Sequence, residues 1–242
     1  RLALIPGVRV EHAALRREIQ RASYPRIGIR DTSIVGTRRE TIVLPGLGAT
    51  WALRGRADAP SAPASLYANV HRGFAPFRFT EAIDNSGLVT ALEPERSWNS
   101  ELGIRTPLGR GVTAELTGFL LLFENQTVSA SDTWGRTDEI ATGVANGGRT
   151  RNAGIESALR VDLGALGAGV PLSLGARYTF TDARFTSDRF YQDGASVVNV
   201  NGRQLPYAPR HSAFVDAVLT TARTETQLVV TAIGRQFGDR RN

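Results

Sequence analysis

The sequence contains no cysteine and no methionine, and we find no lysine, so that its 29 Lys+Arg residues are all arginine. The absence of cysteine excludes disulfide bonds, thiolate catalysis and cysteine–metal sites. No stretch approaches the roughly 18 consecutive apolar residues that a membrane-spanning helix needs. A helical membrane protein is therefore excluded, whereas a protein that crosses a membrane with strands is not.

The charge balance is basic. The 242 residues carry a formal net charge of +6, with a pI of about 10.6. Such a balance is found in proteins that bind nucleic acid. The arginines are spread along the whole chain rather than gathered into a stripe, and an arginine bias of the genome explains them equally well. We therefore expect no nucleic-acid partner.

The sequence does contain long segments in which apolar and polar residues alternate with a period of two, the pattern typical of β-strands. In "NGGRTRNAGIESALRVDLGALGAGVPLSLGARYTFTDARF", two such segments flank a glycine-rich turn. One of their faces is apolar, and the other carries Asn152, Glu156, Arg160 and Arg177. We predict nine strands: residues 2–13, 40–54, 65–74, 96–106, 111–126, two within 146–185, 210–220 and 226–237.

The predicted connections alternate in length. Short ones rich in turn residues are 55–63, 106–111, 162–171 and 220–225, and long ones are 15–39, 75–95, 128–148 and 186–209. Compact soluble domains rarely contain four long loops, whereas outer-membrane barrels have short periplasmic turns and long extracellular loops. Strands of about ten residues or more also match a tilted span of the bilayer.

These patterns predict an all-β chain that forms part of an antiparallel transmembrane β-barrel. The apolar face would meet lipid, and the ionic face would line a wide lumen. Backbone groups in lipid must be paired, so the sheet must close, and nine strands need partners outside this chain. Trp51, Trp98 and Tyr178 are then candidates for the aromatic girdles. The alternative is a soluble β-sandwich with these aromatic residues in its core.

Several blocks of the sequence resemble one family. They are "SLYANVHRGFAPFRFTEA", "LEPERSWNSELGIRTPLGRGVTAELTGFLLLFENQT", "NGGRTRNAGIESALR" and "LPYAPRHSA". In this order and spacing they are similar to the barrel of TonB-dependent outer-membrane receptors, in particular the ferric-citrate and ferric-siderophore branch. Each block is loose by itself, but the four together are specific and extend over nearly the whole chain.

The resemblance implies a barrel of about 22 strands that is plugged by an N-terminal domain. We expect residues 1–242 to be part of that single barrel domain, with the plug domain and the closing strands absent. The implied function is active uptake of a ferric chelate, citrate-like or siderophore-like, across the bacterial outer membrane without chemical conversion. Cobalamin or a carbohydrate is the alternative ligand. The implied partners are outer-membrane lipid and lipopolysaccharide, the ligand, and TonB through the absent N-terminal region; we expect a monomer without a cofactor.

Charged residues of both signs are predicted on the face that lines the lumen. They are Arg9, Glu11, Glu101, Arg105, Glu115, Glu156, Arg160 and Arg177. We interpret them mainly as ion pairs along the wall and with a polar plug, with ligand binding as the alternative. Glu101 and Glu156 lie on non-adjacent strands, and no nucleophile or water-excluding pocket accompanies them. We therefore predict no catalytic residue and no enzyme activity.

Arginines near the long loops are the candidates for ligand binding. They are Arg26, Arg30, Arg38, Arg72, Arg78 and Arg149. Guanidinium groups suit the carboxylates of citrate and similar anionic chelates, because they form bidentate hydrogen bonds. The alternative is a solvated loop whose arginines contact lipopolysaccharide phosphates or no partner at all.

Three further motifs have simpler interpretations. The glycines of "GALGAG" (164–169) join two strands rather than a strand and a helix, which favours a hairpin turn over a nucleotide loop. His12, His71 and His211 are isolated, so no metal site is predicted. The sequon Asn125 to Thr127 is a chance match in a bacterial barrel.

Overall fold

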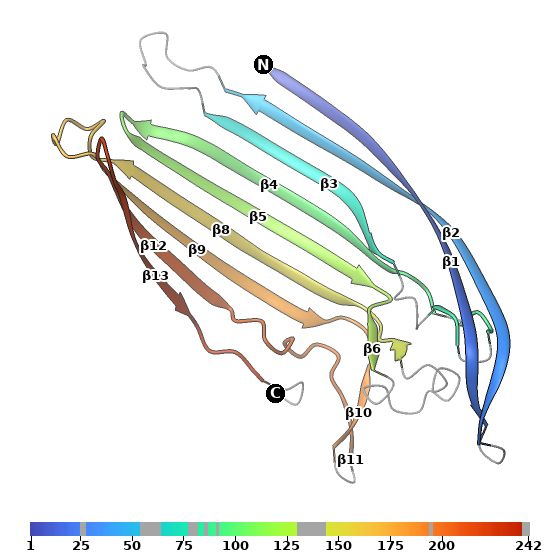
Figure 1. Ribbon diagram of the computed structural model, residues 1–242. Helices are drawn as coiled ribbons and strands as arrows, with labels where there is room; N and C mark the ends of the chain where they lie inside the picture. Colours follow the sequence, from blue (N-terminus) through green and yellow to red (C-terminus); the bar gives the residue numbers. More distant parts are fainter. Residues whose placement is uncertain are drawn as a thin grey trace.

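The computed structural model is built around one nine-stranded antiparallel sheet with the order β1-β2-β3-β4-β5-β8-β9-β12-β13 (Figure 1). It describes residues 1–24, 28–53, 64–76, 82–84, 87–90, 92–129, 144–193 and 196–238, without the side chains of 21–32, 144 and 192–195. The long strands are β1 Leu2–Tyr24, β2 Gly28–Ala52, β3 Ser65–Ala75, β4 Glu95–Gly109, β5 Val112–Glu124, β8 Thr150–Asp162, β9 Leu172–Phe185, β12 His211–Thr220 and β13 Glu225–Ile233. Two short pairs lie outside this sheet: β6 Thr127–Ser129 with β7 Val144–Asn146, and β10 Phe190–Asp193 with β11 Ser196–Asn199.

All nine predicted strands are confirmed, and each pairs with its neighbours in antiparallel register. The described connections at one end of the sheet are the short turns, and the long connections with β6, β10 and β11 lie at the other end (Figure 1). The sheet does not close on itself in this segment, so β1 and β13 are its edges. Among the described residues, no helix has the length and apolarity to cross a membrane.

The register separates the two faces of the sheet. Because successive residues of a strand point to opposite sides, residues that pair across strands form continuous rows on one face. One row of the apolar face contains Leu66, Ile104, Leu116, Ser157 and Tyr178. The adjacent row of the polar face contains Tyr67, Gly103, Thr117, Glu156 and Thr179.

The apolar face is uncovered. Leu102, Leu116, Ile155, Val215 and Leu228 all remain half-exposed or more. A soluble sandwich would bury such residues against a second layer, but the described clusters of buried apolar residues lie in the loop regions instead. The arrangement therefore fits a sheet whose apolar face meets lipid.

The first long connection differs from the prediction. Residues 15–39 were expected to form a loop, but β1 and β2 stay paired from Leu2 with Trp51 to Tyr24 with Gly28. β3 pairs only with the stretch of β2 from Gly46 to Ala52, so the rest of the hairpin projects beyond its neighbour. The period-two pattern missed this ribbon because its arginine-rich sequence has little apolar alternation, while backbone pairing needs none.

An arginine in the middle of the apolar face tests the lipid-facing assignment. We expect Ile155→Arg to destabilise the folded barrel in lipid by about 2–4 kcal/mol, because the charge would lie near the bilayer midplane. The measurement is urea unfolding of the full-length protein in vesicles. Thr179→Arg is the control, since Thr179 lies on the polar face beside Glu156 and should cost far less. Equal losses in both variants would contradict the assignment of the faces.

Candidate functional site on the polar face

The centre of the polar face is organised around the side chain of Tyr67, which lies across a glycine. Tyr67 pairs with Gly103 of β4, and a Cβ atom at position 103 would overlap the tyrosine ring. The ring therefore passes over β4 and reaches β5, where its hydroxyl donates to Glu115 Oε1 at 2.7 Å and contacts Thr117 Oγ1 at 2.5 Å. Gly103 thus allows one side chain to connect three strands.

Glu115 is also held from its other side. Arg105 Nε and Nη2 lie 3.0 and 2.9 Å from Glu115 Oε2, and Nη2 lies 3.1 Å from Oε1. The carboxylate is therefore fixed by two partners, Tyr67 and Arg105. The group borders an open cavity of about 650 Å³. Its lining is Thr50, Ser65, Tyr67, Glu101, Arg105, Glu115, Thr117, Phe119, Leu121 and Glu156.

The same cavity contains both of the carboxylates that were considered as a catalytic pair. Glu101 lies on β4 and Glu156 on β8, with β5 between them, as the strand order predicted. Glu101 accepts a hydrogen bond from Asn69 Nδ2 at 2.9 Å. Within the described part of the chain, no group of three or more acidic, histidine or cysteine side chains is placed to hold a metal ion.

Of the other charged residues predicted for the lumen, Arg160 and Arg177 adjoin this centre, because Arg105 and Glu115 line the same second cavity, whereas Arg9 and Glu11 lie apart from it. Arg9 and Glu11 form an ion pair with each other along β1. Arg160 and Arg177 border a second cavity of about 260 Å³, and the Arg177 guanidinium lies 5.4 Å from the centre of the Phe214 ring. The eight residues therefore share one face, where six of them border two adjoining cavities and Arg9 and Glu11 form a separate pair.

Arg38, a predicted ligand contact, holds a loop in place. Its Nη2 donates to the carbonyl oxygen of Leu92 at 2.8 Å and its Nη1 to that of Thr90 at 3.2 Å. Burial lowers the pKa of Arg38, and the nearby Glu40 carboxylate opposes this shift. Thr90 and Leu92, which lie between β3 and β4, thus dock on the β1–β2 hairpin.

This docking needs a glycine in the hairpin. A Cβ atom at position 36 would overlap Ile83 and the backbone of Gly87, which itself has a φ of +80°. Ala82, Ile83 and Leu92 form a small buried cluster there. The loop is therefore packed onto the hairpin by apolar contacts as well as by Arg38.

The remaining ligand candidates lie in different surroundings. Arg72 is on the apolar face, where its Nη2 is 2.7 Å from Glu124 Oε2 and its guanidinium lies 5.0 Å from the Trp98 ring centre. Arg149 is exposed just before β8, and its backbone N–H donates to Ser187 Oγ at 2.9 Å. Arg26 and Arg78 lie outside the described residues, and Arg30 is in β2 with its side chain outside the description. No two of these arginines are brought together in the described structure, and their role in binding stays a prediction.

The long connection between β9 and β12 has its own core. Phe185, Tyr191 and Val200 are buried together, with Leu205 packed against them. Outside this core, the Asp188 carboxylate accepts hydrogen bonds from the side-chain amides of Asn199 and Asn201, which lower its pKa. This connection therefore carries internal packing of its own at the end of the sheet with the long loops.

Sequence reasoning did not select three residues that organise the polar face. Tyr67 and Thr117 complete the support of Glu115, and Asp216 is a largely buried carboxylate beside Arg160 and Arg177. All three lie at strand positions that point to the polar face, and the alternation of apolar and polar residues in the sequence already indicated this. Their importance depends on which residues pair across strands, because Asp216 lies against its direct partner Gly175 and Tyr67 against Gly103.

Antiparallel strands with one apolar and one ionic face, short turns at one end and long connections at the other define a segment of an outer-membrane β-barrel. The TonB dependent receptor-like β-barrel family matches residues 1–228, and the chain belongs to this family. The barrels of this family lie in the bacterial outer membrane. Its members are transporters rather than enzymes, which agrees with the expectation of no catalytic activity.

Solved structures have the same fold. The unliganded ferric citrate transporter FecA is 24% identical to this chain, with a TM-score of 0.62. The match covers 99% of this chain and 31% of the FecA chain. The ferric yersiniabactin uptake receptor FyuA from Yersinia pestis is 20% identical, with a TM-score of 0.67. The match covers 99% of this chain and 33% of the FyuA chain. The copper transporter OprC is 18% identical, with a TM-score of 0.65. The match covers 96% of this chain and 33% of the OprC chain. The chain thus spans about a third of the length of these proteins.

The contact between Tyr67 and Gly103 gives a sharp test of the polar wall. We expect Gly103→Ala to destabilise the full-length barrel by about 1–3 kcal/mol, because the added methyl group displaces the Tyr67 ring from Glu115 and Thr117. Gly118→Ala is the matched control, since its Cβ would meet only the Leu102 carbonyl oxygen at 3.9 Å. Urea unfolding measures both, and a Gly103→Ala variant as stable as Gly118→Ala would contradict this role of the glycine.

Proposed function

We propose that this chain is part of the barrel of a receptor that imports a ferric chelate across the outer membrane, with energy supplied through TonB. In this proposal residues 1–242 belong to one barrel domain, and the plug and the closing strands are supplied by the rest of the protein. The observation that carries the proposal is the family match together with a polar face lined by fixed charges. The receptor converts no ligand, acts as a monomer, and is surrounded by lipid and lipopolysaccharide.

A ferric chelate is favoured among the ligands for two reasons. Two of the structures of the same fold are a ferric citrate transporter and a ferric yersiniabactin uptake receptor. The exposed Arg149 lies at the end of the sheet with the long connections, where a guanidinium group can bind carboxylates of an anionic chelate. Arg38 supports the same end indirectly, by holding the loop that docks on the long hairpin.

Copper is a second candidate, because the copper transporter OprC also shares the fold. The soft ligands that select Cu(I) are cysteine and methionine, and this sequence contains neither. This segment therefore supplies no thiolate or thioether ligand, and the ferric chelate remains the proposal.

Uptake of radiolabelled iron tests this function. We expect cells that express the full-length receptor to accumulate iron from ferric citrate or a ferric siderophore, and to lose this uptake when TonB is deleted. Cobalamin and an oligosaccharide are tested in parallel. Uptake that does not require TonB, or uptake of cobalamin or carbohydrate without any ferric chelate, would contradict the proposal.

The predicted ligand arginine is tested separately. We expect Arg149→Gln to weaken binding of an anionic ferric chelate about tenfold, the effect of losing one charge-assisted hydrogen-bonding group. The measurement is a binding titration of the full-length receptor. Arg110→Gln is the control, since Arg110 lies in the short turn between β4 and β5 at the opposite end of the sheet. Unchanged affinity in Arg149→Gln would remove this residue from the ligand site.

A further inference from the structure

The apolar face of the sheet ends in a row of five residues, three of which are arginines. Arg72, Trp98, Leu122, Arg151 and Arg184 are successive cross-strand partners from β3 to β9. All five have the same parity as the residues that face lipid. The row lies at the end of the strands with the long connections (Figure 1).

The depth of Arg151 in the membrane can be estimated along its own strand, β8. Arg151 and Val161 lie on the apolar face of β8, ten residues apart (161 − 151). Ten residues extend about 33 Å along a strand, or about 25 Å along the membrane normal at a tilt of about 40°. A lipid-facing band is about 25 Å tall. Arg151 therefore lies at the outer boundary of the band, where lipid headgroups begin, and Arg184 is its direct cross-strand partner on the neighbouring strand.

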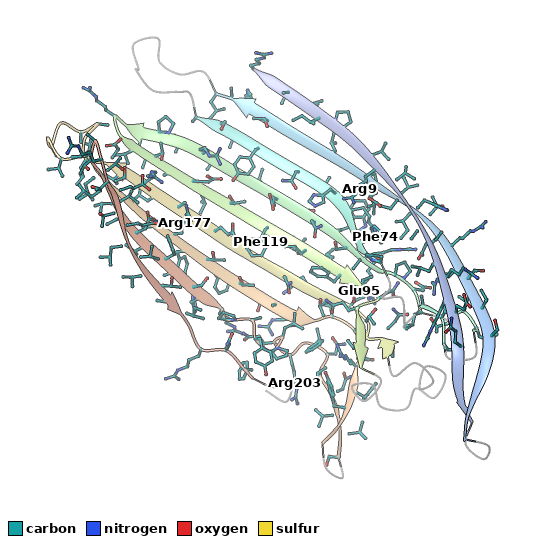
Figure 2. All side chains as sticks on the ribbon, in the orientation of Figure 1. Arg9, Phe74, Glu95, Phe119, Arg177 and Arg203 are labelled. Carbon is teal, nitrogen blue, oxygen red and sulfur yellow. The ribbon has the colours of Figure 1, made fainter. Side chains whose placement is uncertain are left out.

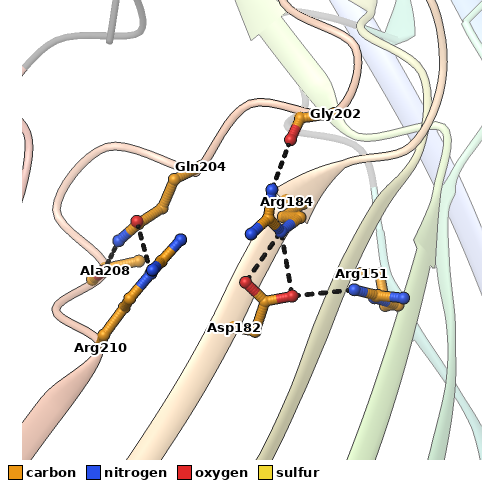
Figure 3. Close-up of polar contacts among 7 residues, drawn as sticks. All are labelled: Arg151, Asp182, Arg184, Gly202, Gln204, Ala208 and Arg210. Atoms are coloured by element: carbon orange, nitrogen blue, oxygen red, sulfur yellow. Dashed lines mark hydrogen bonds and ion pairs between the residues drawn. The ribbon is translucent and has the colours of Figure 1, made fainter.

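One carboxylate holds two of these guanidinium groups. Asp182 Oδ2 is 2.9 Å from Arg151 Nη2, and Asp182 Oδ1 is 2.8 Å from Arg184 Nε (Figure 3). Arg184 Nη1 also donates to the carbonyl oxygen of Gly202 at 2.9 Å. The side chains of Arg151 and Arg184 are still 41% and 37% exposed. The cluster is thus oriented by internal contacts, open to the outside and one positive charge in excess.

The charge excess continues along the face. Within strands β3 to β9, the apolar-face charges of this row and of the rows on either side of it are four arginines (72, 96, 151 and 184) and two carboxylates (124 and 182), which gives a net charge of 4 − 2 = +2. Trp98 lies in the same row and stacks with Arg72, as expected for a residue of an aromatic girdle. A positive surface directly above an apolar one requires a partner that is both acylated and anionic.

We propose that this row binds the phosphate groups of the outer-leaflet glycolipid, lipopolysaccharide. The acyl chains cover the apolar rows below it, and a phosphate accepts charge-assisted hydrogen bonds from Arg151 and Arg184, whose planar N–H donors match its oxygens. Asp182 positions both guanidinium groups and competes with the phosphate for them. The site lies on the outside of the barrel and is separate from the face that lines the lumen.

Lipid retention by the full-length receptor tests this site. The probe is lipid A with both phosphates, and native mass spectrometry measures the fraction of receptor that keeps it in detergent. We expect Arg151→Gln with Arg184→Gln to reduce affinity for lipid A at least about tenfold. The matched control, Arg110→Gln with Arg223→Gln, removes the same charge from two short turns at the other end and should bind like the unmodified protein.

Two further measurements keep the proposal decidable if the double variant does not fold. Asp182→Asn should bind lipid A more tightly, because two guanidinium groups lose a competing carboxylate, whereas a purely structural ion pair would predict weaker binding. Dephosphorylated lipid A should bind the unmodified receptor about as weakly as lipid A binds the double variant. Equal retention of the two lipids, weaker binding by Asp182→Asn, or displacement of lipid A by millimolar inorganic phosphate alone would overturn the proposal.

Discussion

The pairing of backbone hydrogen-bonding groups is the constraint on which this structure depends. In lipid, an unpaired N–H or C=O group costs several kcal/mol, so strands that cross a membrane must be bonded to neighbours on both sides. The antiparallel ladder from β1 to β13 satisfies every inner strand in this way. Once the ladder is fixed, alternation assigns each side chain to lipid or to lumen, and every charged residue of the spanning region is placed by its parity.

The ladder also decides which side chains can reach one another on the polar face. Direct cross-strand pairs on this face combine a glycine with a large or charged partner, among them Gly103 with Tyr67, Gly154 with Phe119, and Gly175 with Asp216. In each pair the missing Cβ leaves room for the partner to lie against the neighbouring strand. Phe119, which is labelled in Figure 2, thus lies across the sheet against β8.

The sequence predicted the sheet better than the loops. The nine strands, their faces and the short turns at 106–111, 162–171 and 220–225 followed from period-two alternation and turn residues, while the turn at 55–63 lies outside the described residues. The ribbon over 15–39 did not follow, because a hairpin outside the membrane keeps its backbone pairs without apolar alternation. The roles of single arginines were not predictable either. Arg38 binds carbonyl oxygens of a docked loop, and Arg72 binds a carboxylate on the apolar face. Both contacts are made to residues far away in the chain.

The sequence by itself therefore determined the class of fold, the strand order and the side of the sheet on which the eight charged residues predicted for the lumen lie, since these depend on local periodicity and on antiparallel hairpins. Only the tertiary structure decided which residues share a row. Register placed Arg105 beside Glu115 and Tyr67 over Gly103, and it placed Arg72, Arg151 and Arg184 in one cross-strand row. The reason is physical: a row joins residues from five strands, and its alignment is set by the sum of all cross-strand hydrogen bonds rather than by any one segment.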